Sequence, residues 1–194
     1  REGLATALMR WAVERLAGTR CVALDATPAG REVYARLGLQ DAFGFARWSV
    51  PDLPVAAGVR PMRAADWPAV LALDAAAFGA PREALLRDFA ARLPGAAFVT
   101  EDGRGFVLAR DGLRAAGIGP VVAPDAASAL SLVAAARTAT GAAVLDLADA
   151  AGSVAEALTR AGGIRLRAFT RMTLGDAAWV IPERNVVLAG PEFG

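Results

Sequence analysis

The sequence contains the same pattern of local structure twice. An ungapped shift places Gly3–Asp25 over Pro124–Asp146, and a slightly longer shift places Tyr34–Val50 over Leu158–Leu174. In both copies a helical period is followed by a short apolar run, a second helical period and a longer strand-like run. The repeat therefore predicts an α/β fold in which one helix–strand–helix–strand unit occurs twice.

The first copy has clear boundary signals. Thr27 and Pro28 suit the N-cap and the first position of a helix, and Gly38 suits its C-terminal end. Cys21–Leu24 is expected to form a buried strand, and a second strand is expected to carry Phe43, Phe45 and Trp48. The helix that precedes them ends before Gly18, and its periodic apolar positions predict an amphipathic helix: Leu4, Leu8, Trp11, Ala12 and Leu16.

The second copy follows a longer series of elements. Two prolines and a glycine without periodicity favour a linker over residues 51–58. Beyond the linker the patterns predict one strand, two helices and three strands, with a hairpin signal at Asp111-Gly112. These elements are expected at Val59–Met62, at Ala64–Phe78, from Pro81 onward, and at residues 96–100, 105–110 and 113–122. Two short strands, Trp179–Ile181 and Val186–Leu188, are expected to end the chain.

Two motifs of the first copy resemble the GNAT superfamily of N-acetyltransferases. The family's cofactor loop is Gln/Arg-x-x-Gly-x-Gly/Ala, and Gly3 and Ala5 match its fourth and sixth positions. The first position of this loop would lie one residue before Arg1, so we expect that the chain begins inside the motif. The more specific match is the segment Thr-Pro-Ala-Gly…Tyr…Leu-Gly, which runs from Thr27 to Gly38.

The resemblance implies a tandem GNAT protein with mixed sheets flanked by helices. Residues 1–50 would be the C-terminal half of one GNAT domain, and residues 59–194 would form a complete GNAT-like domain. Half a sheet leaves an unpaired edge, so the first part is expected to pair with the second part or with another chain.

The resemblance also implies an activity and its site. The family transfers an acetyl group from acetyl-CoA to an amine, here of a small molecule or a peptide. The free N–H groups of a first helical turn favour a pyrophosphate, which places acetyl-CoA at Gly3, Leu4, Ala5 and Thr6. Tyr34 resembles the tyrosine that protonates the leaving thiolate, since a positioned phenol can act as a general acid. A plain turn at Gly3 and a tyrosine packed on the sheet are the alternatives.

The second copy differs at the positions that would carry this chemistry. Pro124 replaces Gly3 and has no N–H to donate, and Leu158 replaces Tyr34 and has no proton to give. We therefore expect the second domain to bind no cofactor, although a pocket should remain where strands 113–122 and 142–147 splay apart. Candidate substrate-binding residues in this part are Arg82, Arg110, Arg114 and Asp146; solvated arginines and a turn aspartate are the alternatives.

Composition narrows the remaining choices. The chain has 194 residues, a formal net charge of +1, no histidine and one cysteine. This predicts no metal site, no Ser-His-Asp or Cys-His machinery and no nucleic-acid partner, and no apolar run is long enough for a membrane helix. Cys21 is expected to be a small core residue, and the four tryptophans are expected in the core or at a domain interface. The protein is expected in the cytoplasm. A non-catalytic ligand-binding module and a homodimerisation module stay open as alternatives.

Overall fold

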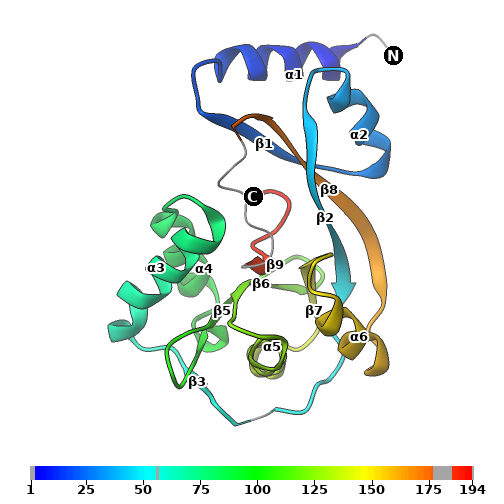
Figure 1. The fold of residues 1–194 in the computed structure, drawn as a ribbon. Coiled ribbons are helices and arrows are strands. Elements are labelled where there is room, and N and C mark those ends of the chain that lie inside the picture. Colours follow the sequence, from blue (N-terminus) through cyan, green and yellow to red (C-terminus); the bar gives the residue numbers. More distant parts are fainter. Residues whose placement is uncertain (1–2, 56, 177–184, 194) are drawn as a thin grey trace.

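The computed structural model describes residues 3–55, 57–176 and 185–193, and their strands form one mixed sheet. The strand order is β1-β8-β2-β7-β9-β6-β5-β4-β3, and Figure 1 shows helices packed around it. The first part of the chain contributes α1 (Leu4–Arg15), β1 (Cys21–Ala26), α2 (Pro28–Ala35) and β2 (Gln40–Ser49). Both parts of the chain therefore belong to the same sheet.

The remaining elements follow the predicted order. They are β3 (Val59–Pro61), the 3-10 turn η1 (Ala64–Asp66), α3 (Trp67–Phe78), α4 (Glu83–Arg92), the 3-10 turn η2 (Pro94–Ala96), β4 (Phe98–Thr100), β5 (Phe106–Arg110), β6 (Ala116–Val122), α5 (Ala126–Thr140), β7 (Ala143–Ala148), α6 (Gly152–Arg160), β8 (Arg165–Gly175) and β9 (Asn185–Leu188). The expected strand at Trp179–Ile181 lies outside the described residues. The cap predicted at Thr27 is confirmed, because its side chain accepts a hydrogen bond from the Gly30 N–H at 3.3 Å.

The strands of the two sequence copies are interleaved rather than side by side. Strand β8 lies between β1 and β2, and β2 lies between β8 and β7, with every pairing antiparallel. The open edge expected for the first part is thus partly closed, since β1 and β2 pair with strands of the second part. Strand β1 remains the last strand at its end of the sheet.

Equivalent residues of the two copies meet across this junction. Phe45 and Phe169 are equivalent in the repeat, lie opposite each other in the β2–β8 register, and stack with ring centroids 5.1 Å apart. Asp25 receives two hydrogen bonds from Arg171, at 2.8 and 2.7 Å. The other aspartate and arginine of the repeat also form an ion pair that joins one copy to the other.

Asp146, the equivalent of Asp25, receives hydrogen bonds of 2.9 and 2.8 Å from Arg47, the equivalent of Arg171. Each copy's carboxylate is therefore held by the other copy's guanidinium. The two ion pairs are thus reciprocal in the numbering of the sequence repeat, and Asp146 serves here as an ion-pair partner.

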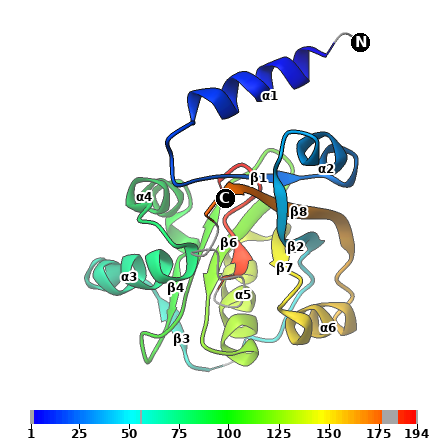
Figure 2. The ribbon, with the colours of Figure 1, turned by 45° about the horizontal axis from the view of Figure 1, so that its top comes forward.

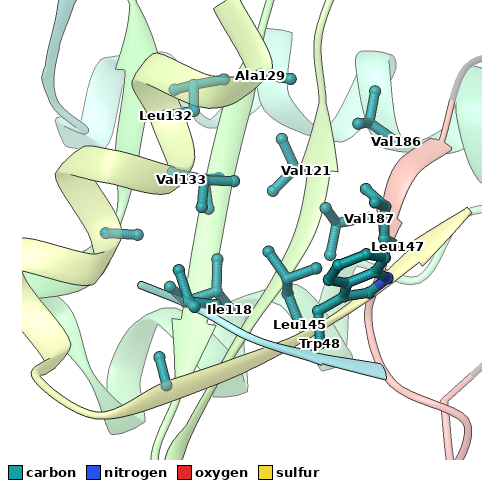
Figure 3. Packing of buried hydrophobic residues seen from close by; sticks show 14 of the residues in the cluster. Trp48, Ile118, Val121, Ala129, Leu132, Val133, Leu145, Leu147, Val186 and Val187 are labelled. Atoms are coloured by element: carbon teal, nitrogen blue, oxygen red, sulfur yellow. The ribbon is translucent and has the colours of Figure 1, made fainter. Parts of the chain in front are cut away.

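Two apolar layers cover the two faces of the β5–β6 region. Alternate residues of these strands point to opposite faces. Val107 and Val121 pack with α5, α6 and Trp48 in the larger cluster (Figure 3), whereas Phe106 and Val122 pack with residues of α3 and α4. Figure 2 shows α3 and α4 apart from α5 and α6. Trp48 thus lies in the core, as expected.

Most of the apolar side predicted for α1 is exposed. Leu4, Leu8 and Trp11 are 81%, 64% and 61% exposed, Leu16 is also exposed, and of the five apolar positions only Ala12 is half-buried. The other half-buried positions of α1 lie on the opposite side of the helix: Thr6, Met9 and Val13. Periodicity shows that a helix has an apolar face, but it cannot show which face a neighbouring element covers.

Other expectations of the sequence are met in part. Cys21 is half-buried on the terminal strand, and burial raises the pKa of its thiol. The expected linker contains no helix or strand among its described residues, and Arg137 anchors it through the Val50 carbonyl and the Asp52 carboxylate, both at 3.0 Å. Among residues 3–55, 57–176 and 185–193, no helix is long and apolar enough to cross a membrane.

Candidate functional site

The start of α1 is an open helix N-terminus. Gly3 adopts a left-handed conformation with φ of 66°, which favours glycine, and its carbonyl accepts the Ala7 N–H at 2.8 Å. Within the part of the chain that the structure describes, which begins at Gly3, no side chain caps the helix, and its first turn has no acidic residue. The N–H groups of Leu4, Ala5 and Thr6 precede the first intrahelical bond, so they remain free to bind an anion.

The start of α5, its equivalent in the second copy, is closed. Asp125 is the N-cap, and its carboxylate accepts the Ser128 N–H at 2.8 Å. This backbone hydrogen bond holds the pKa of Asp125 below its usual value, which keeps the carboxylate charged. Pro124 also contributes no N–H group. The N-terminal end of α5 therefore presents a negative charge, whereas the N-terminal end of α1 presents N–H donors.

Tyr34 lies near the C-terminal end of α2 and is half-buried. Its ring packs with Ala26, Leu39 and Met172 on one face of the sheet. Gly30 makes room for the ring one turn earlier, since a Cβ there would lie 3.0 Å from the ring edge. The equivalent Leu158 of α6 is fully buried. The first copy therefore holds a phenol in a position where the second copy has a core side chain.

Strand β9 occupies part of the space where a pocket is expected in the second copy. Strands β6 and β7 pair in parallel from Ala116 to Ile118, and β9 enters where they diverge. Val187 of β9 lies opposite both Val121 and Leu147. The chain therefore supplies its own strand to pair with the edges of β6 and β7 that diverge.

A pocket remains beside β9, as expected: a cavity of about 190 Å³ is lined in part by Ala123 and Ala151, which follow β6 and β7. It is lined by the N-terminal ends of α5 and α6, which include Asp125, Ala126, Gly152 and Ser153. Its wall carries the Asp125 carboxylate, so the cavity is unfavourable for a phosphate.

Two of the three candidate arginines are engaged by carboxylates of the chain itself. Arg82 is bound by the buried Asp74 through hydrogen bonds of 2.8 and 2.9 Å. Arg110 lies 3.5 Å from the carboxylate of Glu192, and Arg114 is exposed on the turn between β5 and β6. An anion at Arg82 or Arg110 would have to compete with an internal carboxylate.

The Asp25–Arg171 pair was not predicted, although its members are visible in the repeat. Both side chains are almost fully buried, with exposed fractions of 1% and 4%. Burial raises the pKa of Asp25 above its usual value, and the hydrogen bonds from Arg171 oppose that shift. Because a lone buried charge is costly, the pairing explains why the copies retain an aspartate and an arginine at equivalent positions.

Comparison with known proteins identifies the family. The model of the acetyltransferase (GNAT) domain family matches residues 70–186, which is more than half of the chain. The chain belongs to the GNAT acetyltransferase family. No protein of curated function matches the sequence. GNAT enzymes typically use acetyl-CoA, and the open start of α1, with its unclaimed N–H groups, fits the diphosphate of such a cofactor.

Solved structures share the fold of this GNAT protein. A putative acetyltransferase from Pyrococcus horikoshii matches with a TM-score of 0.85 and 22% identity, over 100% of this chain and 67% of its own. A GCN5-related N-acetyltransferase from Sphaerobacter thermophilus matches with a TM-score of 0.59 and 16% identity, over 89% of this chain and 68% of its own. A tandem GNAT protein from the clavulanic acid biosynthesis pathway has a TM-score of 0.56 and 13% identity, over 90% of this chain and 70% of its own.

Proposed function

We propose that this GNAT protein transfers an acetyl group from acetyl-CoA to an amine of a small molecule or a peptide. The observation that carries the proposal is the contrast between two equivalent helix starts. Among the described residues, no side chain caps the N–H groups at the start of α1 and its first turn has no acidic residue, whereas the start of α5 is capped by Asp125. A diphosphate is therefore favoured at Gly3–Thr6 and opposed at Pro124–Ala127.

In the proposed reaction the amine attacks the thioester directly. The new N–C bond forms as the C–S bond breaks, and the thiolate takes the proton of the Tyr34 phenol. The proton lost by the amine nitrogen returns to the phenolate through solvent, so the enzyme ends in its starting state. Acetyl-CoA supplies the activated acyl group, and this chain's residues supply the anion contacts and the proton.

The two sequence copies are proposed to be two GNAT units, of which only the first binds the cofactor. The reciprocal ion pairs and the stacked phenylalanines support this proposal. In each of them a residue of segment 1–50 contacts a residue of segment 59–194 in an arrangement that the repeat relates. The strand β9 between β6 and β7, together with Leu158 in place of Tyr34, supports a non-catalytic second unit.

The alternative is a GNAT-like module that binds a ligand or a second copy without catalysis. The exposed apolar side of α1, with Leu4, Leu8 and Trp11, favours this function because large apolar surfaces are used in association. Measurable acetyl transfer to any amine would decide against it.

The cofactor site can be tested by giving α1 the acidic residue that α5 has at the equivalent position. Leu4 is equivalent to Asp125, and it is exposed, so Leu4→Asp should fold normally while placing a carboxylate at the start of α1. We expect acetyl-CoA to bind about tenfold more weakly in isothermal calorimetry, a loss of ~1.4 kcal/mol, because the added charge repels the diphosphate.

The control is Leu8→Asp, which adds the same charge one turn further along the same exposed side. It should bind acetyl-CoA nearly as well as the native chain, since the effect of the helix dipole is confined to the first turn. Unchanged affinity in Leu4→Asp would move the cofactor elsewhere. Crystals soaked with CoA that show diphosphate density at Pro124–Ala127 would reverse the assignment of the two units.

A further inference from the structure

The C-terminal segment, residues 189–193, places an aromatic ring between a second ring and a cation. The Phe193 ring meets Phe89 of α4 edge to face, with the ring centroids 5.1 Å apart. The Arg110 guanidinium lies over both rings, 5.0 Å from the centroid of Phe193 and 5.7 Å from that of Phe89. The place that the Phe193 ring fills is therefore suited to an aromatic group, since ring edges and cations both attract the face of a π-system.

The guanidinium of Arg110 is nearly buried, but its hydrogen bonds are incomplete. Its side chain is 18% exposed, and within the part of the chain that the structure describes its Nε atom is buried without a hydrogen-bond partner. The Glu192 carboxylate lies 3.5 Å from Nη2, and the Glu192 side chain is 60% exposed. Arg82 shows the contrast, because Asp74 accepts hydrogen bonds of 2.8 and 2.9 Å from two of its nitrogens. Arg110 thus lacks the close carboxylate that a buried charge needs.

The backbone leaves room on the polar side of this guanidinium. A Cβ at Gly117 of β6 would lie 3.3 Å from the Arg110 Cζ, and a Cβ at Gly190 would lie 2.8 Å from its Nη2. Gly190 also has a φ of 132°, which side chains rarely allow. Arg110 follows the fully buried Phe106 and Leu108 on one face of β5. The result is a cation at the end of an apolar face, approached by backbone rather than by side chains at these two glycines.

The segment that fills this place is held by weak polar contacts. The Phe193 carbonyl accepts a 3.5 Å hydrogen bond from Arg82, which is near the limit for such a bond, and the Phe193 N–H donates to Gly190 within the segment itself. Glu192 meets a single nitrogen of Arg110, whereas a free carboxylate can accept from Nε and Nη2 together. A ligand with its own ring and carboxylate can therefore replace the contacts of the segment and complete those of Arg110.

We propose that Arg110 and Phe89 form a binding site for a small carboxylate that carries an aromatic ring, and that Phe193 occupies this site when the ligand is absent. The ring of the ligand takes the place of the Phe193 ring, and its carboxylate binds the Nε and Nη2 atoms of Arg110. Ligand and C-terminal segment then compete for the same place. This site goes beyond the proposed acetyl transfer and does not depend on it.

Calorimetry with 4-phenylbutyrate tests the site, because this probe joins a ring and a carboxylate through a flexible alkyl chain. Phe193→Ala should bind the probe about tenfold more tightly than the native chain does, since the competing ring is gone. The same variant should bind 4-phenylbutanamide, which has no charge, about tenfold more weakly than the acid. It should bind 4-cyclohexylbutyrate, which has no π-system, several-fold more weakly than the aromatic acid. In the native chain, amide resonances of residues 189–193 should shift as 4-phenylbutyrate binds.

A pair of arginine variants in the Phe193→Ala background locates the site. Arg110→Gln should lose binding of 4-phenylbutyrate. Arg87→Gln is the matched control and should keep it, because Arg87 also lies over a ring, that of Trp67 at 4.5 Å, but is 49% exposed and paired with Glu83. Thermal unfolding checks that the variants fold, and the comparison of acid with amide decides the role of the charge even if Arg110→Gln does not fold.

The readouts can overturn each part of the proposal. Equal affinity for the acid and the amide, or equal affinity in Arg110→Gln and Arg87→Gln, would refute the role of Arg110. Phe193→Ala that binds no more tightly than the native chain would refute the competition, and absence of binding to both would refute the site. None of these measurements uses acetyl transfer, so a failure here is distinct from a failure of the proposed function.

Discussion

Replacement of Tyr34 by phenylalanine is expected to lower the turnover of acetyl transfer by about 10²-fold. The substitution removes only the hydroxyl, so the ring keeps its contacts with Ala26, Leu39 and Met172. The affinity for acetyl-CoA should change little, because the phenol acts on the thiolate that forms as the C–S bond breaks. Steady-state kinetics with a thiol reagent for released CoA, together with calorimetry, measure the two quantities.

A second variant separates chemistry from packing. Tyr34→Leu copies the residue that the second unit has at this position, Leu158, and it removes the ring as well as the hydroxyl. Both variants should lose turnover to a similar degree if the hydroxyl is the functional group, even if Tyr34→Leu is less stable. Native turnover in Tyr34→Phe, when chemistry limits the rate, would rule out the proton-donor role.

Replacement of Asp25 by alanine is expected to lower the free energy of unfolding by about 3–5 kcal/mol. The variant leaves the Arg171 guanidinium, which is only 4% exposed, without its carboxylate. The cost arises mainly from this uncompensated charge rather than from the lost hydrogen bonds. Urea unfolding followed by circular dichroism gives the difference.

The control for this prediction lies just beyond the ends of the same two strands, β1 and β8. Arg20 and Asp176 form an ion pair with 72% and 50% exposed side chains, so Arg20→Ala should cost at most about 1 kcal/mol. The double variant Asp25→Leu with Arg171→Met should recover much of the stability, because an apolar pair avoids the desolvation of both charges. A loss below about 1 kcal/mol in Asp25→Ala would show that Arg171 finds another partner or reaches solvent.

The sequence predicted most elements of this fold because their signals are local. Thr27 and Pro28 mark the start of α2 through capping and backbone geometry, which depend on a few neighbouring residues. The internal repeat also relates the equivalent aspartates and arginines by sequence alone. The family motifs at Gly3 and Tyr34 then gave the candidate site, whose roles stay predictions.

The pairing of strands could not be predicted in the same way. Periodicity cannot show that β8 inserts between β1 and β2. Strand β8 is far from both of them in the chain, and no local signal encodes the register in which they pair. For the same reason the salt bridge from Arg171 to Asp25 and the position of β9 could not be predicted.

The interleaved strands also determine when the protein can fold during synthesis. Asp25 and Arg171 are 146 residues apart, so β1 leaves the ribosome long before the strand that completes its pairing. At typical elongation rates this interval is roughly 7–30 s, during which the nascent strands β1 and β2 have no β8 to pair with. A chaperone bound to the emerging chain would protect the unpaired edges of β1 and β2. Pausing of the ribosome before β8 would lengthen the time for which these edges are exposed.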